Sequence, residues 1–194
     1  MPAIYDKFAA NYDRAFAPLE RLGLRRWRQE AIDLLPKNAS ILEIGCGAGA
    51  NFEFYPQCRR AVSSEISIGM LDVARTKRRE NLLIQADAQS LPFGENEFDA
   101  AFATLVFCSI PDPTAAFKEL RRVIKPGGKV ILLEHVRPEG ILGPVFDLLN
   151  KATLALADDH FNRETAKLAA DSGLKIVEVR KKLASIVNLI VCEV

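Results

Sequence analysis

The sequence predicts an α/β fold built on a mostly parallel sheet with helices on both faces. Five apolar, strand-like runs between residues 40 and 134 alternate with helical segments, which is typical of a parallel sheet covered by helices. Two further β-rich runs, at residues 174–180 and 185–192, are joined by a short link. They predict an antiparallel hairpin that closes the sheet at one edge.

Hydrophobic spacing gives the order of the elements. Up to about residue 36, aromatic side chains recur at intervals of three and four, which predicts two helices. The five strands are expected at residues 40–44, 60–64, 82–86, 98–103 and 129–134. Further helices are expected over residues 113–124, 142–157 and 163–172, the first of them ending in a turn at residues 126–128, Pro-Gly-Gly.

Composition bounds the class of protein. The chain has 194 residues, 49% hydrophobic and 26% charged, so we expect residues 1–194 to form a single globular domain. The formal net charge of +1 is too small to attract a nucleic-acid partner through the overall electrostatic field. The N-terminus has no apolar run typical of a signal peptide, and polar residues and a proline interrupt the apolar stretch 141–157, so we expect no membrane span.

Cysteine usage indicates a reducing compartment. The four cysteines are far apart and include no C-x-x-C pair, so they fit neither a disulfide framework nor a zinc site. We therefore expect a cytoplasmic protein without a bound metal.

A glycine-rich loop is the sharpest motif. Residues 41–49 read Ile-Leu-Glu-Ile-Gly-Cys-Gly-Ala-Gly, an apolar strand that enters a loop with glycines at 45, 47 and 49. Glycine allows a ligand to approach the backbone closely and tolerates positive φ. Glu65 ends the next expected strand, where an acid accepts hydrogen bonds from both ribose hydroxyls of a nucleoside.

This loop alone also fits the dinucleotide fingerprint of dehydrogenases, Gly45-x-Gly47-x-x-Ala50. The third strand favours another interpretation. It ends at Asp87, an acid suited to the amino group of an adenine, and residues 91–93 offer apolar walls for the ring. No dehydrogenase fingerprint requires these residues, and nothing resembles a domain for hydride transfer.

With the glycine loop, Glu65, Asp87, Phe98-Asp99 and residues 120–128 in this order, the chain resembles the class I S-adenosylmethionine (SAM)-dependent methyltransferases. The resemblance covers residues 39–135 closely. It implies a Rossmann-like, seven-stranded sheet and a methyl transfer that leaves S-adenosylhomocysteine (SAH). The cofactor-binding residues that we expect from it are Glu43, Gly45, Cys46, Gly47, Gly49, Glu65, Ile66, Met70, Asp87, Ala88, Thr104, Tyr5 and Tyr12.

These residues have different expected roles. The glycines line the methionine and ribose, Glu65 holds the ribose hydroxyls, Asp87 with Ala88 recognises the adenine, and Ile66 and Met70 pack nearby. Tyr5 and Tyr12 either close over the cofactor or belong to the core, as aromatic residues at helical spacing usually do.

Three segments, residues 50–56, 104–109 and 134–136, resemble small thiol S-methyltransferases, and bacterial phosphatidylethanolamine and quinone methyltransferases share a similar frame. Residues 104–109 lack the Asn-Pro-Pro-Tyr loop with which related enzymes hold a flipped base, which argues against nucleic-acid methylation. The expected acceptor is a small metabolite, a thiol or a lipid head group, and its identity stays open. A SAM-binding module without turnover is the contrasting hypothesis.

Methyl displacement needs alignment in a dry pocket, and a general base only if the acceptor must lose a proton. His135, directly after the fifth strand, and His160, in a polar cluster between two helices, are the candidate catalytic residues; each also fits a structural role. Cys108 either faces the methyl or is a buried small hydrophobe. Residues 1–36 and 141–172 are expected to cover the substrate.

The basic segment 21–28 has interleaved apolar residues. It fits either peripheral contact with an anionic membrane or a solvated helix face with Trp27 in the core.

Overall fold

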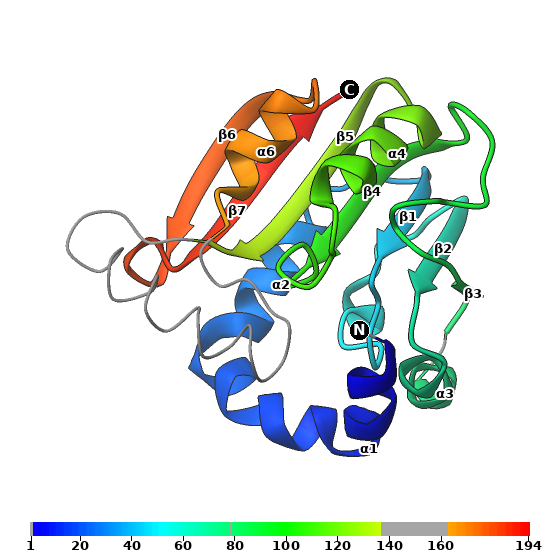
Figure 1. The fold of residues 1–194 in the computed structure, drawn as a ribbon, viewed down its shortest axis with the longest axis vertical. Helices are drawn as coiled ribbons and strands as arrows, with labels where there is room; N and C mark the ends of the chain where they lie inside the picture. Colours follow the sequence, from blue (N-terminus) through cyan, green and yellow to red (C-terminus); the bar gives the residue numbers. More distant parts are fainter. Residues whose placement is uncertain (1, 78, 137–162) are drawn as a thin grey trace.

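The computed structural model describes residues 2–77, 79–136 and 163–194. Within these ranges, seven strands form one sheet in the order β3-β2-β1-β4-β5-β7-β6 (Figure 1). The strands are β1 (Ser40–Ile44), β2 (Arg60–Glu65), β3 (Leu82–Gln85), β4 (Phe98–Thr104), β5 (Ile124–His135), β6 (Lys175–Lys182) and β7 (Val187–Glu193). The first five are parallel, whereas β7 is antiparallel to β5 and β6, which confirms the predicted fold class.

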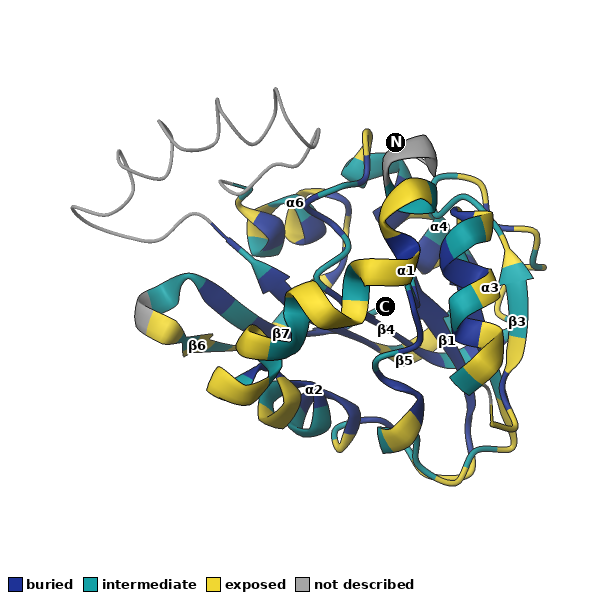
Figure 2. Cartoon of the chain, turned by 90° about the horizontal axis from the view of Figure 1, so that it is seen from below, coloured by how far each residue is buried: buried dark blue, intermediate teal, exposed yellow. Residues whose placement is uncertain are grey.

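Helices cover both faces of this sheet. They are α1 (Pro2–Leu19), α2 (Arg25–Ile32), α3 (Ile68–Lys77), α4 (Pro113–Val123) and α6 (Thr165–Asp171), with a π-helical turn η1 (Glu20–Leu24) and short 3-10 turns η2 (Phe52–Phe54) and η3 (Leu183–Ser185). Helices α4 and α6 lie on one face and α2 on the other (Figure 2). The helix expected at residues 142–157 lies outside the described ranges.

Side chains alternate between two cores because successive strand residues point to opposite faces. On β1, Leu42 and Ile44 join the core under α4, where Leu120 is 1% exposed. Ile41 joins the other core, against Ile32 of α2. Burial on both faces explains why the central strands are continuous apolar runs.

The turn expected at residues 126–128 lies within β5, which begins at Ile124. The register against β4 shifts there from Phe98–Ile124 to Ala100–Lys129, Gly127 has φ of 75°, and its amide donates to the Val194 carbonyl at 2.9 Å. A Cβ at Gly128 would lie 2.8 Å from the Asp99 carbonyl oxygen, so glycine allows this segment to pass close to β4. Gly127 and Gly128 thus allow β5 to begin at Ile124, before the strand start expected at residue 129.

Candidate functional site

The glycine loop leaves β1 at the point where the strand order reverses. Gly45, Gly47 and Gly49 have φ of 62°, 52° and 81°, in the left-handed region that favours glycine. An added Cβ would lie 2.6 Å from Val106 at Gly45 and 2.6 Å from Phe52 at Gly49, but at Gly47 it would meet no atom within 4 Å. Gly47 therefore faces open space, where a ligand has access to the loop backbone.

Glu65, the last residue of β2, lies against this loop. Its carboxylate accepts hydrogen bonds from the amides of Gly47 and Ser67, both at 2.9 Å. A carboxylate has about four lone-pair positions, so it retains capacity for ligand hydroxyls. Burial raises the pKa of Glu65, and the amide bonds oppose that rise. A hydrogen bond thus joins Glu65, the expected acceptor for the ribose hydroxyls, to Gly47, whose other side faces open space.

The end of β3 lies beside Glu65, since the Ala86 amide donates to the Glu65 carbonyl at 3.1 Å. The Asp87 carboxylate accepts the Gln89 amide at 2.9 Å and so orders its own turn. Ile66 is 37% exposed, which leaves an apolar surface at this edge. Leu91 and Phe93, the apolar residues expected to wall the adenine, pack in and against the hydrophobic core, respectively.

Several expected cofactor residues are buried behind the loop. Glu43 is 0% exposed and accepts hydrogen bonds from Tyr55 and, at 2.7 Å, from Asn51. Asn51 also donates to Thr104, at the end of β4, at 2.8 Å. Burial raises the pKa of Glu43. This network fixes the glycine loop to β4 and gives Glu43 and Thr104 a supporting position.

Two further expected cofactor residues pack as apolar groups. Cys46 is 4% exposed beside Phe52, and burial raises the pKa of its thiol well above the ordinary value, which disfavours the reactive thiolate. Met70 is 1% exposed and packs with Ala9 and Ala48 beneath α1.

Arg28 of α2 is a feature that the sequence analysis missed. It is 3% exposed and donates to Thr104, to Asn51 at 3.2 Å and to Glu20 at 3.0 Å. Arg28 lies three and four residues before the buried Ala31 and Ile32. This spacing places the three residues on one face of the helix and so could have indicated that Arg28 is buried. It places a buried positive charge beside the glycine loop.

Helix α1 crosses the carboxyl ends of the strands. Tyr5 donates to Ser109, after β4, at 3.1 Å, and Asp6 accepts from Ser67 at 2.5 Å and from the Gly69 amide at 2.9 Å, after β2. These bonds hold the pKa of Asp6 below its ordinary value. The helix therefore bridges the two sides of the site, as a cover would.

Tyr12, on the same helix, stacks on Phe16 with ring centroids 4.4 Å apart. Burial raises the pKa of Tyr12 to about 12, so its hydroxyl stays protonated and available as a donor at neutral pH. Arg28, Cys108 and Glu65 act electrostatically on this hydroxyl. Tyr12 therefore packs within α1 with its hydroxyl near charged groups of the candidate site.

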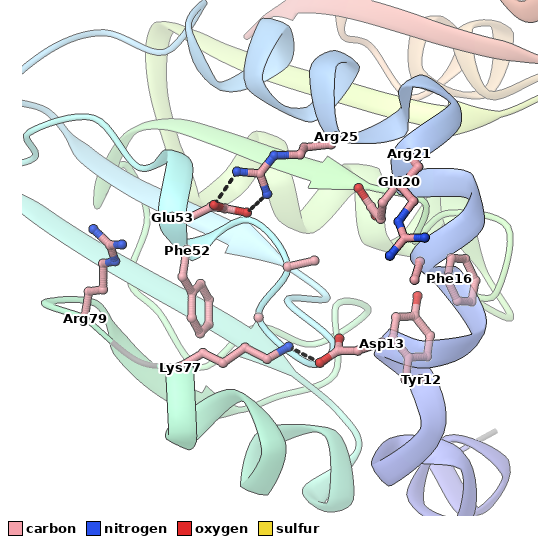
Figure 3. Close-up of a pocket in the computed structure, with 13 residues that line it drawn as sticks. Tyr12, Asp13, Phe16, Glu20, Arg21, Arg25, Phe52, Glu53, Lys77 and Arg79 are labelled. Carbon is pink, nitrogen blue, oxygen red and sulfur yellow. Dashed lines mark hydrogen bonds and ion pairs between the residues drawn. The ribbon is translucent and has the colours of Figure 1, made fainter.

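A cavity of about 530 Å³ lies between α1 and the segment that follows the glycine loop. Tyr12 and Phe16 line one side and Phe52 the other, and the ion pairs Arg25–Glu53 and Lys77–Asp13 cross it (Figure 3). Its volume is in the range of ligand sites. The ion pairs tie α1 and α2 to the body of the domain.

The predicted catalytic residues have different outcomes. His135 is half-buried at the end of β5, opposite Val187 in the ladder. Cys108 is 6% exposed, with its sulfur 3.8 Å from the Ser109 oxygen. His160 and most of the expected cover at residues 141–172 lie outside the described ranges; within the remainder, α6 spans Thr165–Asp171.

In the basic segment 21–28, Leu24 and Arg28 are buried and Trp27 packs against the core, whereas Leu22 is 79% exposed. In the parts of the chain that the structure describes, no helix is long and apolar enough to cross a membrane. The same parts contain no group of three or more residues suited to hold a metal ion.

The fold is a doubly wound α/β sheet, and ligands of such sheets bind outside the carboxyl ends of the strands where the strand order reverses, here between β1 and β4. A family model described as a methyltransferase domain matches residues 42–132. Over these residues the chain is therefore similar to methyltransferases, and a solved SAM-dependent methyltransferase shares its fold.

Individual relatives have different reported substrates. Demethylmenaquinone methyltransferase of Renibacterium salmoninarum is 32% identical over 139 residues, covering 70% of this chain and 59% of the relative. Thiol S-methyltransferase TMT1B of Mus musculus is 32% identical over 140 residues, covering 67% and 57%. The chain thus spans less than two thirds of the length of these relatives.

The fold has a full-length match among solved structures. A SAM-dependent methyltransferase of Thermotoga maritima, described as a possible histamine N-methyltransferase, superposes with a TM-score of 0.75 at 23% identity. The match covers 100% of this chain and 99% of the other.

Proposed function

We propose that this protein transfers a methyl group from SAM to a small acceptor and releases SAH. The observation that carries the proposal is the open face of Gly47, whose amide is 2.9 Å from the Glu65 carboxylate at the point where the strand order reverses. A close backbone approach beside an ionised acceptor suits an adenosine ribose.

Each part of SAM has a proposed partner among the residues of the site. Glu65 accepts from the ribose hydroxyls, Asp87 and Ala88 face the adenine, and the exposed Ile66 packs on its ring. Arg28 supplies a buried positive charge for the carboxylate of the methionine part. When bound, SAM supplies an electrophilic methyl group on a sulfonium sulfur.

The acceptor is proposed to be a thiol or a quinol. The turn after β4, Leu105–Cys108, is apolar apart from its backbone and lies against the glycine loop, which suits an apolar acceptor. Both acceptor types are more nucleophilic after losing a proton, and we assign that proton to His135, with His160 as the second candidate. Helix α1 excludes water from the reaction.

The test is SAH production with two probes, 2-mercaptoethanol and reduced 1,4-naphthoquinone, under anaerobic conditions. Methylated product in equal amount to SAH with either probe supports the proposal. Tight SAM binding without SAH from either probe, or from a wider acceptor library, would favour a SAM-binding module without turnover.

We propose further that the protein works in the cytoplasm, in contact with membrane surfaces. All four cysteines are free thiols, as expected in a reducing compartment. Leu19 and Leu22 are 47% and 79% exposed next to Arg21 and Arg25, which supports peripheral binding to anionic lipid. Flotation with phosphatidylglycerol vesicles but not with phosphatidylcholine vesicles is expected, and equal flotation with both would contradict the charge argument.

A further inference from the structure

The turn after β4 adopts a conformation that needs support from its surroundings. Leu105 has φ of 58°, in the left-handed region that L side chains rarely adopt. Its amide still donates to the Leu133 carbonyl of β5 at 2.7 Å, so the turn begins directly at the last rung of the ladder. Strain of this kind persists only where neighbouring groups determine it.

Glu134, on β5, is the group that holds the turn after β4 in this conformation. Its side chain is 0% exposed, and its carboxylate accepts the Val106 amide at 3.1 and 3.2 Å and the Phe107 amide at 3.2 Å. A buried carboxylate that binds two successive amides fixes the orientation of both peptide units.

The Leu105–Phe107 turn packs against the glycine loop. Val106 packs so closely on Gly45 that a Cβ there would lie 2.6 Å from its methyl carbon. On its other side, the Phe107 carbonyl accepts a hydrogen bond from Arg163, and Ser109 accepts one from Tyr5 of the cover helix. A shift of this turn would therefore move the surface that contacts both the glycine loop and helix α1.

We propose that Glu134 is a positioning residue for methyl transfer: it holds the Leu105–Phe107 turn against Gly45 and so aligns the methyl donor with the acceptor. Glu134 acts through the turn and not on the acceptor, since its carboxylate is fully buried and bound to backbone amides. The inference rests on the proposed function and adds the residue that sets its geometry.

The experiment compares Glu134→Gln with Leu132→Ala. Glutamine keeps the size of the side chain but presents an N–H₂ group to one of the two amides. Leu132 is fully buried on the same face of β5, so its truncation weakens the core while the Glu134 carboxylate and its bonds to the two turn amides are kept. Three quantities are measured on each variant: amide hydrogen exchange, binding of SAM carrying a ¹³C-labelled methyl group, and SAH production with the two probes named above.

For Glu134→Gln we expect amide protection at Val106 and Phe107 to fall by about tenfold relative to Leu133, which corresponds to 1.4 kcal/mol. The bound methyl resonance should broaden or split, and turnover should fall by about 10²-fold, the loss expected from a misplacement of about 1 Å. The SAM dissociation constant should change by less than about tenfold. Leu132→Ala should lower protection throughout the core and leave the methyl resonance single.

A sharp, unshifted methyl resonance with unchanged turnover in Glu134→Gln, despite loss of protection at the two amides, would overturn the positioning role. Equal effects of both variants on the resonance would assign Glu134 to general stability and also overturn it. Failure of the wild-type protein to bind SAM would overturn the proposed function, and the inference with it.

Discussion

Replacing Glu65 tests the cofactor site at the group with the clearest geometry. The carboxylate accepts two backbone amides at 2.9 Å and is proposed to accept both ribose hydroxyls. Hydrogen bonds to a charged group contribute about 1.5–3 kcal/mol, so Glu65→Ala should weaken SAM binding by roughly 10- to 150-fold. Glu65→Gln, which keeps one acceptor oxygen, should lose less.

The assay is calorimetric titration with SAM and SAH, with circular dichroism to confirm the fold. Glu97→Gln is the matched control, because Glu97 also accepts a backbone amide, from Gly94 at 2.8 Å, but lies directly before the amino end of β4, away from the carboxyl ends of the strands. If Glu65→Ala binds SAM like the wild type, the ribose is placed wrongly.

The pH dependence provides a second check on the same group. Burial raises the pKa of Glu65 above its ordinary 4.5, and the ribose bonds need the ionised form. SAM affinity should therefore fall on acidification at a higher pH than an ordinary glutamate would give, and Glu65→Gln should remove this dependence.

Three other predictions concern the loop, the cover and the absence of a metal requirement. Both glycines have positive φ, so alanine at either position adds backbone strain. Gly47→Ala should weaken SAM binding with this strain alone acting on the melting temperature, because its Cβ meets open space, whereas Gly45→Ala adds the contact with Val106 and should lower the melting temperature further; equal thermal losses would contradict this. Tyr5→Phe removes the bond to Ser109, about 0.5–1.5 kcal/mol, and should reduce SAH production more than SAM affinity; equal losses in both would remove α1 from the cover. Turnover should persist in chelator, because displacement at a sulfonium carbon needs no Lewis acid, and loss of activity that magnesium restores would refute this.

The sheet was predictable because its signal is local. Burial on both faces makes β1 and β4 short apolar runs, and the glycine loop and Glu65 follow directly from the ends of their strands. The position of a residue at the end of a strand, such as Glu65 at the end of β2, could therefore be predicted from the sequence.

Other features depend on contacts between distant segments. Gly128 joins β5 because it passes close to Asp99, a contact that the Pro-Gly-Gly sequence alone does not contain. Arg28 is indistinguishable by composition from its exposed neighbour Arg26, and only its helix face buries it against Thr104. Glu134 was visible as the end of a buried strand, but its role requires the position of the Val106 amide.

The most direct test of the central claim is a calorimetric titration of the wild-type protein with SAM and, in parallel, with NAD. Gly47, Glu65 and Asp87 predict saturable binding of SAM at one site per chain and no detectable heat from NAD. Binding of NAD without binding of SAM would show that the glycine loop serves a dinucleotide and would contradict the account.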